Sequence, residues 1–319
     1  MKLIKIVDDR KHVLRWTELP TRIVSLVPSD TDSVVRLGAG ARLVGRTRYC
    51  VEPVGQVEAI EVVGGTKDVD VERVAALEPD LVIANQEVNT QADIERLDAL
   101  GLRVLVSFPK TVAAGVGQLA RLARALGLDS GAEPARSLVA SAYAALREAE
   151  ASRGKQLSGA PGGGGPAPSP ALRTFVPIWM DPLMTVHGAT FISDVLELVG
   201  AENVFADRER RYPLAADLGN RAPLPPEKVE GRDTRYPRVT LDEIVARAPE
   251  LVLLPDEPHA FSEADAAVFR GLDIPAAKTG NIVFCDGKDL MWYGARAALG
   301  LGRLRALVDA ARSRAVPTG

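Results

Sequence analysis

The sequence predicts an α/β protein with two similar Rossmann-like lobes, each built on a mainly parallel sheet, joined by a single long backbone helix. Three features predict it: a helix–strand unit that occurs twice, apolar strands that alternate with helices around both copies, and a long helix-forming segment between them. Ligands of parallel α/β sheets lie at the carboxyl ends of the strands. We therefore expect a ligand cleft between the lobes.

The duplicated unit spans residues 71–84 and residues 241–254, which are 170 positions apart. Each copy begins as a short amphipathic helix with an acid in its first turn, Glu72 in one and Asp242 in the other. A proline then stops the helix, because its ring cannot continue the helical hydrogen bonding, and an apolar strand follows. Two copies of this unit predict two lobes of the same kind.

The strands outside the repeat are short apolar runs bounded by polar loops. The loop after the first strand of each lobe leads into a helix that ends in a Gly-Ala turn, at Gly38 and at Gly200. Each lobe then continues through the repeated unit to a further loop, helix, strand and helix. These additional strands are predicted at residues 22–26, 103–108, 173–178 and 281–286.

Composition along the chain predicts the domain boundaries. Residues 1–130 form the N-terminal α/β lobe, and residues 131–156, rich in the strong helix formers Ala, Leu, Arg and Glu, form the linking helix. About 20 such residues span roughly 30 Å as a helix. Residues 157–171 are rich in Gly and Pro and are expected to form a flexible loop. Residues 172–319 form the C-terminal α/β lobe, with an insertion at about 207–235.

The net charge of −3 gives no electrostatic reason to expect nucleic acid or an anionic membrane surface as a partner. The densest basic group, Arg208, Arg210 and Arg211, is expected in a solvated loop. Cys50 and Cys285 are the only cysteines and form no CxxC pair, so we expect packed thiols rather than a zinc site or a disulfide framework.

No apolar stretch approaches the ~20 residues of a membrane span. The first ten residues also lack an apolar core of signal-peptide length. As written, the chain is therefore expected to be soluble and unexported.

Aromatic residues make up 5% of the chain, yet four of them fall on loops at the ends of predicted strands: Tyr49, Trp179, Trp292 and Tyr293. Flat, stiff side chains at a cleft suit a broad planar or chelated ligand. Further side chains on the same loops are candidates for ligand contacts, and the charged ones among them could form bonds to polar groups of the ligand. These further candidates are Arg48, Glu87, Met180, Asp181, Asp256, Glu257 and Arg296.

The three histidines, His12, His187 and His259, show no HxxxH or HxH spacing, so no protein-built metal site is predicted. His259 is the one imidazole with ligand-like neighbours, Asp256 and Glu257. The chain carries no nucleophile elbow, P-loop or metalloprotease motif. We therefore expect neither an enzyme nor a covalent cofactor, and any metal arrives already chelated.

Six motifs in a fixed order give the chain a family resemblance. The sequence resembles the solute-binding proteins of ABC importers for cobalamin and ferric siderophores, known as helical-backbone metal receptors. The resemblance covers roughly residues 20 to 310. The motifs that carry it lie at residues 22–29, 44–47, 64–66, 71–82, 200–205 and 236–242.

The resemblance implies a monomeric binding protein that captures a metal chelate and delivers it to the permease of an ABC importer. Its ligand would be a cobalamin-like corrinoid, a ferric siderophore or a haem-like chelate. Glu72 and Asp242 match the acids through which this family docks onto the permease. The resemblance places the protein in the periplasm or at the cell surface, whereas the missing signal peptide leaves the cytoplasm as the alternative.

Two other functions remain open. A cytoplasmic two-lobe enzyme, such as a glycosyltransferase or a metal chelatase, would use Glu87, Asp256 or His259 as acid or base. A cytoplasmic carrier of corrinoids or metal chelates would keep the fold without a transporter. In that carrier, alanine at Glu72 and Asp242 would leave function untouched.

Overall fold

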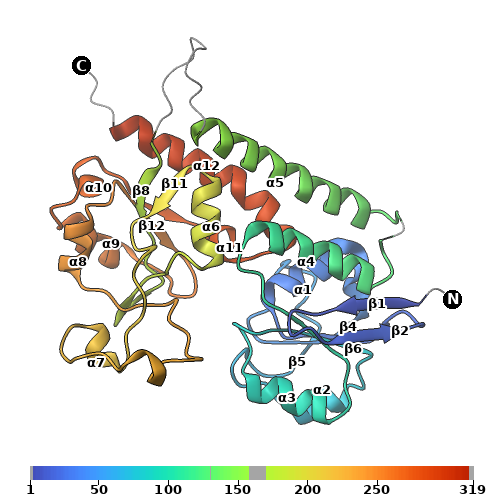
Figure 1. Ribbon diagram of the computed structural model, residues 1–319. Coiled ribbons are helices and arrows are strands. Elements are labelled where there is room, and N and C mark those ends of the chain that lie inside the picture. The colour runs from blue at the N-terminus through green and yellow to red at the C-terminus, as the bar shows by residue number, and fades with distance from the viewer. Residues whose placement is uncertain (1–2, 130, 158–169, 316–319) are drawn as a thin grey trace. The chain divides into compact units, whose positions relative to one another are not determined.

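The computed structural model describes residues 3–129, 131–157 and 170–315 (Figure 1). The chain divides into two compact units. Unit 1 holds the chain up to Leu146 together with Trp292–Ala298, and unit 2 holds Arg147–Met291 and the chain from Leu299 onward. Most of the loop predicted at 157–171 lies outside the described residues.

Unit 1 is built on a five-stranded sheet with the order β5-β4-β3-β6-β7, in which every pairing is parallel. Its central strands are buried on both faces, as continuous apolar runs in parallel sheets are. The strands are β3 (Ile23–Ser25), β4 (Leu43–Arg46), β5 (Glu61–Val62), β6 (Leu81–Asn85) and β7 (Val104–Ser107). The helices are α1 (Pro28–Val34), η1 (Val35–Ala39), η2 (Gly40–Arg42), α2 (Val71–Ala76), α3 (Gln91–Ala99) and α4 (Val112–Ala125).

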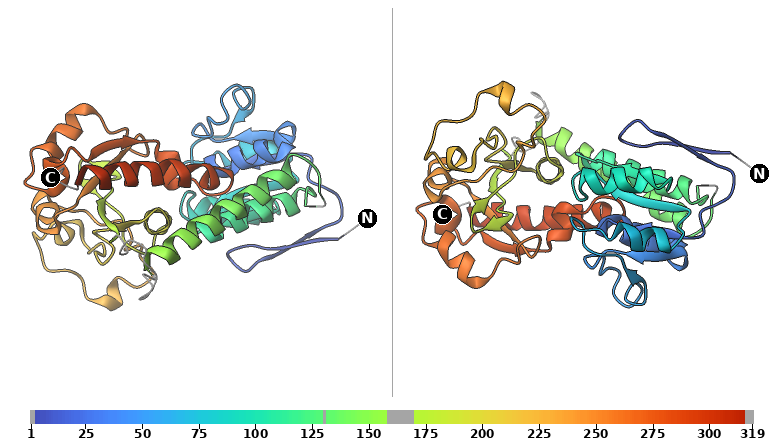
Figure 2. Two further views of the ribbon diagram at one scale, coloured as in Figure 1. Left: turned by 90° about the horizontal axis from the view of Figure 1, so that it is seen from above. Right: turned by 90° about the horizontal axis from the view of Figure 1, so that it is seen from below.

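An antiparallel hairpin precedes this sheet, and the sequence patterns above did not predict it. It consists of β1 (Ile4–Val7) and β2 (Val13–Trp16), and it packs against α4. Buried and exposed residues alternate along β1, which is the period of a strand with one covered face. The hairpin is the dark blue ribbon in both views of Figure 2.

Unit 2 is built on a four-stranded parallel sheet with the order β11-β8-β12-β13. Its core includes Phe175, whose ring centroid lies 5.4 Å from that of Phe205 and 5.9 Å from that of Phe269. The strands are β8 (Leu172–Phe175), β11 (Ala201–Asn203), β12 (Leu251–Pro255) and β13 (Ile282–Cys285), with a separate hairpin of β9 (Trp179–Met180) and β10 (Leu183–Met184). The helices are α6 (Phe191–Leu198), α7 (Leu214–Asp217), η3 (Pro226–Lys228), α8 (Leu241–Arg247), α9 (Glu263–Arg270), α10 (Pro275–Lys278) and α11 (Gly287–Met291).

The repeated unit is present in both sheets, as α2 followed by β6 and as α8 followed by β12. The two copies also end their helices in the same way. Glu78 and Ala248, at equivalent positions of the repeat, are both non-glycine residues with positive φ, 46° and 44°. A left-handed residue ends a helix, and the proline after each one prevents its continuation. The prediction of two α/β lobes with mainly parallel sheets is confirmed.

Two long helices contain residues of both units. The helix predicted between the lobes is α5 (Ala135–Leu157), and the boundary between the units falls within it, after Leu146. The boundary also falls within α12 (Ala295–Ala315), because Trp292–Ala298 belongs to unit 1. Trp292, Tyr293 and Arg296 therefore lie in unit 1, whereas the sequence had placed them in the C-terminal lobe.

Candidate functional site

An aromatic cluster lies where two neighbouring strands of unit 2 end. Trp179 opens the hairpin that follows β8, and His259 and Phe261 follow β12. The ring centroid of His259 lies 5.6 Å from that of Trp179 and 4.6 Å from that of Phe261. Trp179 remains 42% exposed although its indole is fixed by a hydrogen bond from Nε1 to the carbonyl oxygen of Asp181. This cluster offers a fixed, accessible aromatic surface.

The imidazole of His259 is oriented by a carboxylate. Its Nε2 lies 3.4 Å from Oδ2 of Asp265, in the first turn of α9. The backbone N–H of Ser262, which donates to the same carboxylate, holds the pKa of Asp265 below its usual range. Asp265 therefore stays charged and available to the imidazole. Among the described residues no group of three or more His, Cys, Asp and Glu side chains is arranged to hold a metal ion.

The other predicted residues of unit 2 lie on the same two loops, after β8 and after β12, in different environments. Met180 is half-buried and packs against the core of the unit, and Asp181 is exposed. Asp256 follows β12, but its Oδ1 accepts a hydrogen bond from the backbone N–H of Gly287 at the start of α11. Glu257 is half-buried against Gly287, where an added Cβ would approach the Glu257 side chain to 2.6 Å. The Asp256 carboxylate thus holds the first residue of α11 by a hydrogen bond, and the Glu257 side chain packs against the same residue.

In unit 1, Arg48 and Tyr49 follow β4 and lie together. The guanidinium carbon of Arg48 is 5.4 Å from the ring centroid of Tyr49, and the Arg48 guanidinium also pairs with Asp68. Tyr49 is 54% exposed. Glu87, after β6, is half-buried, and its carbonyl oxygen accepts a hydrogen bond of 2.7 Å from Lys67. An exposed tyrosine, Tyr49, therefore lies at the carboxyl edge of this sheet with the guanidinium of Arg48 beside its ring.

Tyr293 and Trp292 differ from the exposed platforms that the sequence suggested, because both are buried in unit 1. The Tyr293 hydroxyl donates to Asp30 at 3.1 Å, accepts from Asn85 at 3.0 Å and lies 3.0 Å from the Ser107 hydroxyl. A phenol with three buried polar neighbours is satisfied within the protein. Tyr293 thus anchors the start of α12 to unit 1.

Asp30 is a buried residue of this network that the sequence patterns did not single out. It lies in the first turn of α1 and is fully buried. Burial raises its pKa from 3.8 to about 7, against the opposing effect of the hydrogen bond from Tyr293. The available signal was a strand followed by Pro and an acid, which is typical of a helix start.

The predicted residue Arg296 is half-buried. Burial raises the pKa of Asp32, and the positive charge of Arg296 opposes that rise.

The two predicted docking acids occupy the same place in the two copies of the repeat. Glu72, in the first turn of α2, has a side chain that is 77% exposed and forms an ion pair of 2.6 Å with Arg96. Asp242, in the first turn of α8, is exposed beside a capping box formed by Thr240 and Glu243. A helix N-terminus stabilises an acid by about 0.3–1 kcal/mol. Both acids are accessible to a partner.

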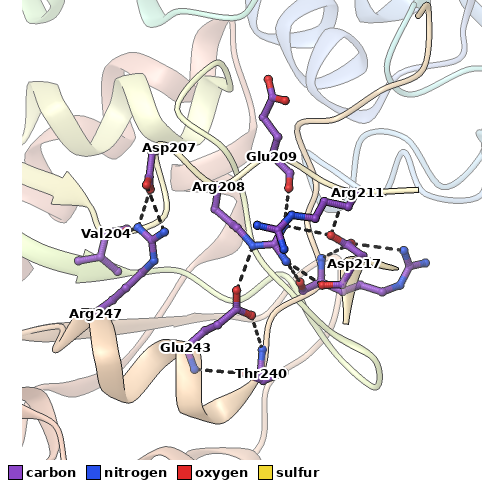
Figure 3. A network of polar contacts seen from close by, with 10 residues as sticks. Val204, Asp207, Arg208, Glu209, Arg211, Asp217, Thr240, Glu243 and Arg247 are labelled. Carbon is purple, nitrogen blue, oxygen red and sulfur yellow. Dashed lines mark hydrogen bonds and ion pairs between the residues drawn. The ribbon is translucent and has the colours of Figure 1, made fainter. Parts of the chain in front are cut away.

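The insertion of unit 2 is more ordered than a solvated basic loop. Arg208 is buried, and its guanidinium pairs with Asp217 at 3.1 Å and with Glu243 at 3.0 Å (Figure 3). The expectation that Arg208 is solvated is therefore wrong, because two carboxylates surround it.

Cys50 and Cys285 are free thiols, as predicted, and burial raises the pKa of each.

A hollow of about 800 Å³ lies elsewhere in unit 1. It is at the amino ends of β4 and β5, opposite the edge at which Tyr49 lies, and it contains none of the predicted binding residues. Its lining residues are Val35, Gly38, Gly40, Ala41, Leu43, Val44, Gln56, Ala59, Ile60 and Glu61. The volume of this hollow alone does not identify it as the ligand site, because parallel sheets bind ligands at their carboxyl edges.

Comparison with known proteins shows the family. Residues 23–288 match the model of the periplasmic binding protein family, which is most of the chain. The chain belongs to this family. Within the residues that the structure describes, this periplasmic binding protein has no helix long and apolar enough to traverse a bilayer.

Individual relatives of this periplasmic binding protein include a vitamin B12-binding protein of Photorhabdus laumondii, 26% identical over 235 residues, which are 74% of this chain and 70% of that one. The fold is similar to that of the periplasmic vitamin B12-binding protein BtuF of Vibrio cholerae, with a TM-score of 0.68 and 19% identity over 92% of this chain and 98% of that one. It is also similar to the periplasmic heme-binding protein RhuT of Roseiflexus sp. RS-1, with a TM-score of 0.68 and 18% identity over 91% and 98% of the two chains. These relatives are named as binding proteins, not as enzymes.

Proposed function

We propose that this protein captures a metal chelate at the carboxyl edges of its sheets and delivers it to the permease of an ABC importer. The chelate is a corrinoid, a haem-like macrocycle or a ferric siderophore. One observation carries the proposal: Trp179 is exposed at a strand end, yet its ring is held by His259 and by its own hydrogen bond to Asp181. A fixed indole binds a flat ligand at low entropic cost.

Three further observations support the proposal. Family membership favours a binding protein of the periplasm or cell surface, and we propose that it acts as a monomer. The names of the relatives favour a tetrapyrrole-like cargo, because they mention vitamin B12 and heme. His259 lies beside the indole with an imidazole oriented by Asp265, which supports a role for His259 as a ligand of the metal of a chelate stacked on Trp179.

Trp179→Ala is expected to weaken chelate binding about three- to tenfold, because aromatic stacking contributes about 0.5–1.5 kcal/mol beyond the buried area. The measurement is a titration of the purified protein with haemin, hydroxocobalamin and a ferric catecholate, followed by absorbance. Tyr49→Ala is titrated in the same way, to test the carboxyl edge of the sheet in unit 1.

Two variants serve as controls for this titration. Trp179→Phe keeps a ring and should recover most of the affinity. Val268→Ala removes another exposed apolar side chain of unit 2 and should leave the affinity unchanged. If Trp179→Ala and Tyr49→Ala both bind as tightly as the unaltered protein, neither edge carries the ligand.

Charge reversal at the docking acids should separate cargo binding from delivery. Glu72→Lys and Asp242→Lys are expected to leave chelate affinity unchanged and to reduce uptake through the cognate permease in proteoliposomes at least tenfold when combined. Opposed charges across an interface govern association, and like charges there cost several kcal/mol.

The matched control for delivery is Glu150→Lys, which reverses an exposed acid on α5 outside the repeat. It should transport normally. Full uptake by the double docking variant would contradict the assignment of Glu72 and Asp242 and would favour a carrier that needs no transporter.

A further inference from the structure

The outer edge of β1 carries backbone groups that no strand pairs with. Within the described residues the hairpin is a sheet of two strands, so one edge of each strand is open. The N–H of Asp8 donates to the carbonyl oxygen of His12 at 3.0 Å, and hydrogen-bonded and non-hydrogen-bonded pairs alternate along an antiparallel ladder. Lys5 and Val7, at odd separations from Asp8, are therefore in non-hydrogen-bonded pairs. Their N–H and C=O groups point away from β2.

A second hollow of unit 1, of about 520 Å³, lies between this edge and α4. Lys5, Ile6 and Val7 line it on the side of β1, and Gly117 and Ala120 are among the residues that line it on the side of α4. An added Cβ at Gly117 would have no atom within 4 Å, so the small residues of α4 leave this space open. The hollow can therefore receive an extended segment beside β1.

The charge around this hollow is positive. Lys5, Arg121 and Arg124 line it, and no acid among the described residues does. Arg121 is paired with Asp9 at 2.9 Å, whereas Lys5 and Arg124 are exposed and have no ion-pair partner among the described residues. Arg15 lies directly opposite Lys5 in the hairpin, and like charges at directly opposed positions are destabilising. An acidic partner would offset this repulsion.

We propose that the outer edge of β1 and the adjoining hollow bind an extended acidic peptide segment of a partner protein. The segment adds to the hairpin as a third strand, about 4.8 Å from β1, and exchanges hydrogen bonds with the backbone of Lys5 and Val7. Its carboxylates form charge-assisted hydrogen bonds with Lys5 and Arg124. An open strand edge recognises a main chain, which a lipid headgroup lacks, so these observations favour a peptide over a membrane surface.

The test compares two short fluorescent peptides, one in which glutamate alternates with valine and one in which lysine alternates with valine. Binding to the purified protein is measured by fluorescence anisotropy. The glutamate peptide is expected to bind in the micromolar range, at least about tenfold tighter than the lysine peptide, and added salt should weaken it. Equal affinities of the two peptides, or no saturable binding of the glutamate peptide up to about 1 mM, overturn the proposal.

A matched pair of proline variants tests the strand edge. Val7 and Val13 are direct cross-strand partners, 47% and 44% exposed, in a non-hydrogen-bonded pair, so proline at either position removes no hydrogen bond between β1 and β2. Of the two, Val7 lines the hollow. Val7→Pro is expected to weaken binding of the glutamate peptide about three- to tenfold, because one hydrogen bond is lost. Val13→Pro should bind normally, and an equal affinity of both variants overturns strand addition.

Two further variants test the hollow and its charge without altering the backbone of the hairpin. Gly117→Gln fills the hollow and favours the helix, since glutamine has a higher helix propensity than glycine, so it should fold and lose the peptide. Its control is Gly154→Gln on α5, where an added Cβ also has no atom within 4 Å. Lys5→Glu with Arg124→Glu should abolish the preference for the glutamate peptide, whereas Arg147→Glu, at an exposed arginine of α5, should keep it.

Amide hydrogen exchange locates the bound peptide. In the free protein the N–H groups of Lys5 and Val7 should exchange faster than that of Ile6, and the glutamate peptide should protect both of them. Protection confined to other segments contradicts the assignment. Phosphatidylglycerol vesicles are tested in parallel, and binding of these vesicles without binding of the peptide would overturn the proposal in favour of a lipid surface.

Discussion

Asp217→Ala is expected to lower the free energy of unfolding of unit 2 by about 3–5 kcal/mol, as the removal of one partner of a buried ion pair does. The Asp217 side chain is fully buried and bonds the Arg208 guanidinium and two backbone N–H groups. Its loss leaves Arg208 charged in a buried position with Glu243 alone. Urea denaturation followed by tryptophan fluorescence and circular dichroism measures the change.

The matched control for this prediction is Asp207→Ala, which removes the partner of Arg247 in the same region. The Asp207 side chain is 75% exposed, so its loss should cost no more than about 1 kcal/mol. Equal losses in the two variants would show that burial of the Arg208 pair contributes nothing to stability.

Stability is expected to fall as the pH rises from about 4 to about 7, because Asp30 is easier to protonate in the folded state. Its pKa is 3.8 in the unfolded reference and about 7 in the folded protein, so the folded state binds more protons between these values. The difference amounts to roughly 4 kcal/mol at most between the two ends of the range. Above pH 7 this contribution no longer changes.

The neighbours of Asp30 donate hydrogen bonds that lower its pKa, and burial outweighs them. Tyr293 donates to Oδ2, Nε2 of Gln118 lies 3.5 Å from Oδ1, and Arg121 and Ser107 act more weakly. Oε1 of Gln118 is buried without a hydrogen-bond partner. Rotation of the Gln118 amide by 180° would exchange Nε2 and Oε1 and bring the oxygen to Asp30. A proton on Asp30 would then supply the donor that this oxygen lacks.

Asp30→Asn tests this assignment, because asparagine keeps the shape and cannot ionise. The variant should lose most of the decrease in unfolding free energy between pH 4 and pH 7, measured by urea denaturation at each pH. Glu95→Gln, at an exposed acid on α3, should retain the full decrease. An unchanged slope in Asp30→Asn would place the titrating group elsewhere.

Local patterns predicted the strands and helices of both sheets because each element carries its own signal. The buried strands β6 and β12 are continuous apolar runs, and each follows a helix that a proline ends. Among the candidate residues, Tyr49 and Trp179 are exposed at strand ends as proposed. Trp292 and Tyr293 carried the same local signal, yet they are buried in the other unit.

The repeated helix–strand unit, the parallel sheets and the family could be predicted from the sequence, because these follow from hydrophobic period, proline position and motif order. The environments of single side chains became visible only in the folded protein. The Tyr293 hydroxyl meets Asp30 across 263 positions of the chain, and Arg208 meets Glu243 across 35. Burial and hydrogen bonding between distant segments set which groups are paired, which titrate and which remain accessible to a ligand, and no local pattern encodes those contacts.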